Sequence, residues 1–200
     1  KGEETEEEDE EEEPPGPLQH EELRAHPLCP NLVVPAGCEC AVFMPQLGTK
    51  FPSDGRQVAI CDPEGSLVMR AAAATGGREW QGRRLLLWDS SGNLLATCRD
   101  SEKTQVLLIC SPRGPFATFE RTGADAYQLA GVGGSWALRL ARSWPPGGGV
   151  RSSLALVDGA GSMLAVCEPS QQASGGRAVR VDARIDVGLA VMSFLRADWE

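Results

Sequence analysis

The stretch that decides the fold is Ile185-Asp-Val-Gly-Leu-Ala-Val-Met-Ser-Phe-Leu195, near the end of the chain. Its apolar residues do not alternate with a period of two. When wound at about 100° per residue they cover every side of a helix, and a helix that is apolar all round must be buried all round. These eleven residues are too few to cross a bilayer, which takes about 20, so the stretch predicts a helix inside the protein.

The predicted helix spans residues 183–198. Asp182 is its expected N-cap, because an Asp side chain accepts hydrogen bonds from the first helical turn. Asp186 and Gly188 are weak helix formers that would loosen this turn. The side chains expected in the core are those of Ile185, Leu189, Val191, Met192, Phe194 and Leu195.

A repeated phrase before this stretch predicts β-hairpins. It consists of an apolar run, Asp-x-x-Gly, a small polar residue and another apolar run. Asp at the first turn position accepts a backbone hydrogen bond, and Gly at the fourth adopts the positive φ that closes the turn. The three turns run from Asp62 to Gly65, from Asp89 to Gly92 and from Asp158 to Gly161.

The three turn aspartates could also be imagined as a cluster for calcium or for acid–base chemistry. The turn role is favoured because each Asp occupies the position where local hydrogen bonding is common. We expect the hairpin tips to lie at different ends of a barrel, too far apart to share a metal ion. A glycine-rich segment, 131–134, is likewise interpreted as a turn, since it lacks the third glycine and the helix of a dinucleotide site.

Short apolar or alternating runs predict about twelve strands in all. Strands this short and this closely spaced indicate a sandwich or barrel, whereas the uneven spacing of the hairpins argues against a propeller. The expected strands are 41–44, 57–61, 67–73, 83–88, 94–99, 105–109, 115–120, 127–130, 136–140, 153–157, 163–167 and 178–181.

The Asp-x-x-Gly hairpins, the twelve strands and the closing segment 182–195 resemble the tubby C-terminal-like superfamily, especially its LURP-one-related and phospholipid-scramblase-like branches. The resemblance covers about residues 38–198. It implies a closed twelve-stranded β-barrel with a hydrophobic helix along its axis, and lipid binding as a tendency of the family. The Lys/Arg cluster that binds phosphoinositide in tubby proteins does not align here, and neither does the calcium-binding segment of scramblases.

The domain organisation follows from charge. Residues 1–22 hold twelve acidic side chains, which leaves 16 acidic and 18 basic residues in a nearly neutral body. A run such as 6–13 repels itself and has no apolar surface to bury, so residues 1–27 are expected to be a disordered acidic and Pro-rich leader. The mainly β domain is expected over 28–200. The leader either keeps the protein soluble or binds a basic protein partner, and it disfavours nucleic acid.

Catalysis and metal binding have little support in the sequence. The only histidines, His20 and His26, belong to the leader, so Ser-His-Asp and Cys-His mechanisms are not expected and we predict no enzyme activity. Those histidines with Cys29, Cys38 and Cys40 fit no standard zinc spacing, so no metal or cofactor is expected. The seven cysteines are predicted to be reduced and mostly buried, which favours an intracellular location.

The predicted ligand site is the densest basic region. If hairpins bring these cations together, they form an anion site suited to an acidic phospholipid or phosphoinositide head group, with Trp80 as an interfacial anchor. The alternative is a set of solvated cations that protect strand edges. The residues are Arg70, Arg78, Arg83, Arg84, Arg99 and Lys103.

The leading functional hypothesis is therefore a non-catalytic module that binds an anionic lipid or membrane surface. A structural accessory subunit or scaffold in a larger assembly comes second, and a scramblase-like protein third. No stretch is long and apolar enough to cross a membrane, so a soluble or peripheral protein is expected. The chain opens with Lys1 and not Met, which leaves room for a removed targeting segment.

Overall fold

A computed structural model describes residues 27–32, 34–45, 54–75, 83–100, 106–124, 126–143, 153–170 and 176–198. The predicted acidic leader, apart from Pro27, lies outside these residues, and so do His20 and His26.

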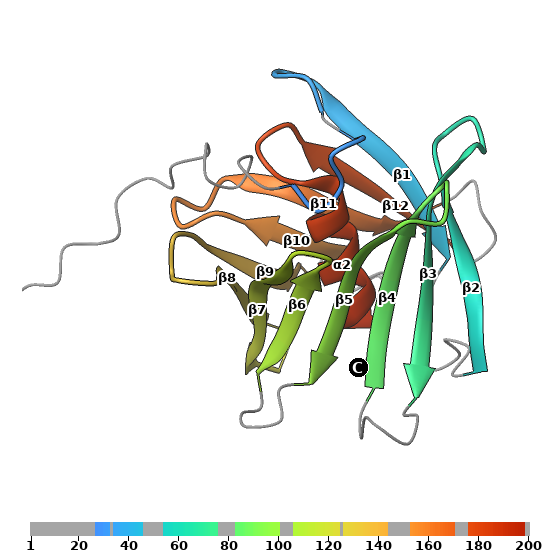
Figure 1. Cartoon of the computed structure of the whole chain (residues 1–200). Helices are drawn as coiled ribbons and strands as arrows, with labels where there is room; N and C mark the ends of the chain where they lie inside the picture. Colours follow the sequence, from blue (N-terminus) through green and yellow to red (C-terminus); the bar gives the residue numbers. More distant parts are fainter. Residues whose placement is uncertain are drawn as a thin grey trace, which may run out of the picture.

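The described chain forms twelve strands and one helix (Figure 1). Each of the twelve strands expected from the sequence overlaps one of them. The strands are β1 (Glu39–Pro45), β2 (Asp54–Cys61), β3 (Leu67–Thr75), β4 (Arg83–Asp89), β5 (Leu94–Asp100), β6 (Leu107–Ser111), β7 (Gly114–Gly123), β8 (Ala126–Gly131), β9 (Ala137–Ser143), β10 (Ser153–Val157), β11 (Met163–Pro169) and β12 (Gly176–Asp182). The helix is α2 (Val187–Asp198).

The strands form a closed antiparallel barrel in which each strand pairs with its neighbours in the chain. The ring closes where β1 pairs with β12 along seven residue pairs, from Glu39 opposite Asp182 to Pro45 opposite Gly176. On its other side β1 pairs with β2 at one position, Phe43 opposite Cys61. The predicted fold class, a mainly β barrel around a C-terminal helix, is confirmed.

The connections β2–β3, β4–β5, β6–β7, β8–β9 and β10–β11 all lie at one end of the barrel, which we call the turn end. The three Asp-x-x-Gly turns are among them, so the expectation that their tips lie at different ends is wrong. The reason is topological: in an up-and-down barrel every second connection falls at the same end. In Figure 1 the β2–β3 and β4–β5 turns of this end are seen at the top, and we call the opposite end of the barrel the loop end.

The three turns share one local geometry. The Oδ1 atom of Asp62 accepts the N–H of Ser66 at 2.7 Å, and Asp89 and Asp158 accept the N–H four residues ahead in the same way at 2.8 Å. The fourth residue of each turn is a glycine with φ between 81° and 90°. A side chain is strained at such φ values, which explains the glycine.

The helix begins later than predicted. Asp182 is not its N-cap: its carbonyl and carboxylate accept the N–H groups of Ile185 and Arg184 in a turn that precedes the helix. Asp186 caps the helix instead, since its Oδ1 accepts the N–H of Leu189 at 2.8 Å. Ile185 is therefore buried in this turn and not in the helix.

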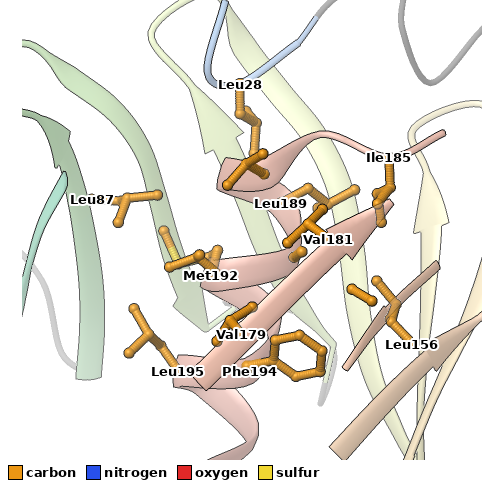
Figure 2. Packing of buried hydrophobic residues seen from close by; sticks show 14 of the residues in the cluster. Leu28, Leu87, Leu156, Val179, Val181, Ile185, Leu189, Met192, Phe194 and Leu195 are labelled. Atoms are coloured by element: carbon orange, nitrogen blue, oxygen red, sulfur yellow. The ribbon is translucent and has the colours of Figure 1, made fainter. Parts of the chain in front are cut away.

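The helix fills the barrel. Leu189, Val191, Met192, Phe194 and Leu195 are all fully buried. Figure 2 shows Met192 and Leu195 on the side of the helix that faces Leu87, and Phe194 on the other side, toward Leu156. The only hydroxyl in this part of the helix, that of Ser193, donates to the Leu189 carbonyl at 2.7 Å, so it is satisfied within the helix.

At the turn end, residues 27–32 cover the start of the helix. Leu28 and Cys29 belong to the core, and the Cys29 N–H donates to Oδ2 of Asp186 at 3.0 Å. Gly188 permits this approach, because a Cβ there would lie 3.0 Å from Oδ1 of Asp186 and 3.2 Å from the Cys29 Cβ. Burial raises the pKa of Asp186, and the surrounding backbone N–H donors oppose that rise.

Two truncations test this contact. Deleting 1–26 should leave the thermal midpoint almost unchanged, because the described contacts to the barrel begin at Pro27. Deleting 1–32 removes the buried Leu28 and the Cys29 hydrogen bond to Asp186, at a cost of roughly 3 kcal/mol or more. For a protein of this size we expect a fall in the midpoint of roughly 6–12 °C. Thermal melts followed by circular dichroism measure both, and equal midpoints would contradict the contact.

At the loop end, an ion pair joins the end of the helix to the wall. Arg177 on β12 donates through Nη2 to Oδ1 of Asp198 at 2.6 Å, and the two side chains are only 7% and 6% exposed. Arg177 also hydrogen-bonds Cys167 on the neighbouring strand β11. Both ends of α2 are thus fixed to the rest of the barrel by charged groups.

Candidate functional site

Arg84 and Arg99 form the one pair that the structure brings together among the described members of the predicted basic site. Arg84 on β4 lies directly opposite Arg99 on β5. Their neighbours Leu85 and Cys98 are buried in the core, so the alternation of the strands directs both arginines to the outer face. Both side chains are partly exposed. The pair lies near the loop end, where β4 begins and β5 ends.

Arg70 lies on the adjacent strand β3 but at a different height. It is opposite Trp88, whereas Arg84 is opposite Ala74, four residues further along β3. Four residues of strand correspond to about 13 Å, so Arg70 is not an immediate neighbour of the Arg84 and Arg99 pair. Arg70 lies nearer the turn end.

The remaining predicted members add less. The backbone of Arg83 pairs with Thr75 beside the Arg84 and Arg99 pair, and its side chain is not described. Arg78, Lys103 and the proposed anchor Trp80 lie outside the described residues. The described part of the predicted site is therefore a pair of arginines on the wall, with a third cation further along it.

A second candidate site lies at the turn end, and the sequence did not reveal it. A groove of about 610 Å³ is bounded by residues 27–30 on one side and by the β4–β5, β6–β7 and β8–β9 turns on the others. Two of the three large apolar side chains that are exposed among the described residues, Leu94 and Val132, line it. We call this cavity the turn-end groove.

Two aromatic side chains line the groove. The rings of Phe116 and Trp136 lie 6.1 Å apart, inclined at 53°. Gly131 makes room for the indole, because a Cβ there would lie 2.6 Å from Nε1 of Trp136. The glycine-rich segment 131–134 is a turn, as its sequence predicts. Its first residue makes room for the tryptophan, and its second, Val132, lines the groove.

The sequence contains only a weak signal for this groove. An exposed valine between glycines is unusual in a turn, but its partners come from three other segments of the chain. These segments lie close together because every connection from an even-numbered strand to the next odd-numbered strand falls at the turn end. The expectation that the hairpin tips lie at different ends of the barrel gave no indication of this.

Burial affects the acidity of three of the described thiols. Burial raises the pKa of Cys29 and of Cys167 to about 12, and it also raises the pKa of Cys40. Such thiols stay protonated near neutral pH and are poor nucleophiles. Cys38 is exposed while Cys29 is buried, and no group of three metal-ligating side chains occurs among the residues that the structure describes.

Comparison with known proteins adds no family. No protein-family model matches the chain, and no curated protein is significantly similar to it. Among the described residues, no helix is both long enough and apolar enough to cross a membrane.

Proposed function

We propose that the chain is a non-catalytic binding module whose outer β4–β5 face holds an anionic ligand, with an acidic phospholipid or phosphoinositide head group as the favoured class. The observation that supports this is the cross-strand pair of Arg84 and Arg99. The register places two guanidinium side chains on the same outer face of neighbouring strands. An anion that contacts both would gain charge-assisted hydrogen bonds.

The position of the pair also supports the proposal. It lies near the loop end of β4 and β5, on the outer face of the wall and away from the barrel core. The resemblance to tubby-like proteins, in which lipid binding recurs, agrees with this class of ligand. Membership of that superfamily is part of the proposal.

Vesicle sedimentation tests this function. We expect the full-length protein to sediment with phosphatidylcholine vesicles that contain phosphatidylserine or phosphatidylinositol bisphosphate, and to lose binding as salt is raised. Arg84→Ala/Arg99→Ala should lower the bound fraction at least several-fold. Preference for the bisphosphate over phosphatidylserine would separate head-group recognition from general attraction to negative charge.

The matched control is Arg121→Ala/Arg139→Ala, which removes the same charge from exposed positions on β7 and β9. It should bind nearly as well as the unmodified protein. An equal loss in both double variants would show that net charge, and not the Arg84 and Arg99 pair, governs binding. Absence of sedimentation at low salt would contradict the proposal and favour a structural role in a protein assembly.

A further inference from the structure

We infer that the turn-end groove is a binding site for a small amphipathic molecule that carries an aliphatic body and a single carboxylate. This site is separate from the proposed outer-face site, since it lies at the opposite end of the barrel. Its volume, about 610 Å³, falls within the roughly 300–1,000 Å³ that is usual for small-molecule sites.

The exposed apolar side chains that line the groove indicate that the ligand has an apolar part. Leu94 and Val132 are 39% and 53% exposed, so each leaves apolar surface in contact with water. The tilted rings of Phe116 and Trp136 line the same groove. Covering this surface with an aliphatic chain would be favourable by about 25 cal/mol for each Å² removed from water.

Apart from Arg113, the polar side-chain groups of the lining residues are the hydroxyls of Ser111 and Ser135 and the indole N–H of Trp136. Four of the residues that line the groove are prolines, which have no N–H to donate. The Ser111 hydroxyl is already engaged, because it donates to the Gly114 carbonyl at 3.3 Å and accepts the Arg113 N–H at 3.2 Å. The prolines are Pro27, Pro30, Pro112 and Pro115.

The charge of the groove indicates which head group the ligand carries. Arg113 is the one charged residue among the described residues that line the groove, and its side chain is exposed at the β6–β7 turn. A guanidinium binds a carboxylate through two parallel hydrogen bonds. An apolar cavity with one cation therefore matches a molecule with one negative charge, and it does not match a neutral or cationic amphiphile.

Isothermal titration calorimetry on the full-length protein tests the inference, with dodecanoate as the probe below its micelle concentration. We expect saturable binding of one dodecanoate per chain. Dodecyltrimethylammonium, which has the same chain and the opposite charge, should bind at least tenfold more weakly. Acetate, which has the head group without the chain, should not bind measurably.

Two variants and one control variant locate the site. Val132→Asp should raise the dissociation constant for dodecanoate at least tenfold, and the control Met163→Asp, the same type of change at the exposed apolar residue outside the groove, should leave it unchanged. Arg113→Gln should weaken the binding of dodecanoate several-fold and reduce the preference for dodecanoate over dodecyltrimethylammonium. All three altered positions are exposed, so thermal melts should show folded proteins.

The results that overturn the inference are distinct from those that concern the outer face. If Val132→Asp and the unmodified protein had the same affinity for dodecanoate, dodecanoate would bind outside the turn-end groove. Several weak sites per chain would lead to the same conclusion. No saturable binding at all would mean that the groove does not take such a molecule, for instance because it receives side chains of a protein partner. None of these outcomes affects vesicle binding through Arg84 and Arg99.

Discussion

Replacing Leu189 by Asp should prevent the protein from folding. Leu189 is fully buried between the barrel wall and residues 27–32, so the variant would carry an unpaired charge where no water or cation can reach it. That cost, added to the lost apolar contact, is several kcal/mol, whereas the total stability of a domain is about 5–15 kcal/mol. We expect insoluble protein, or soluble protein without a cooperative melt in circular dichroism.

The matched control is Leu94→Asp, the same substitution at a leucine that is 39% exposed on the β4–β5 hairpin. It should fold, with a change in stability within about 1 kcal/mol. If Leu189→Asp were soluble and melted cooperatively like this control, the helix would not occupy the barrel interior, and the fold described here would be wrong.

Replacing Arg177 by Met should destabilise the protein by about 3–5 kcal/mol. The loss arises because the Asp198 carboxyl group, whose side chain is only 6% exposed, loses its 2.6 Å partner. For a protein of this length the midpoint should fall by roughly 6–20 °C, measured by thermal or urea unfolding.

The double variant Arg177→Met/Asp198→Leu distinguishes the cause. An apolar pair leaves no buried charge, so much of the lost stability should return. If the double variant were as unstable as the sum of its two single variants, the ion pair would not be the interaction that holds the end of the helix. A charged pair on the surface, Arg180 with Glu168, serves as the control, and Arg180→Met should cost less than about 1 kcal/mol.

The sequence predicted the barrel because its signals are local. The Asp-x-x-Gly motif predicts the same hairpin turn wherever it occurs. The apolar character of 185–195 can be judged without knowing what surrounds it. The start of the helix could not be judged in this way. Asp182 and Asp186 are equally good caps in isolation, and the choice depends on Cys29, which lies 157 residues away and donates to Asp186.

The candidate sites illustrate the same limit. Arg84 and Arg99 belong to the densest basic region of the sequence, which is why they were predicted to bind a ligand. They meet because β4 and β5 pair in a register that the intervening turn sets. Arg70 belongs to the same basic region, but the register of β3 moves it along the wall. The turn-end groove depends on four separate segments, so no single stretch of sequence carries its signature.

The order of elements along the chain has a kinetic consequence. α2 follows all twelve strands, and β1 finds its main partner in β12, so the barrel acquires both its filling and its closing contacts from residues that are made after eleven of its strands. Until then the inward leucines of the earlier hairpins have nothing to cover them. Contacts this distant in sequence make folding slow, and a chain released before residue 187 would expose its inner wall to other proteins.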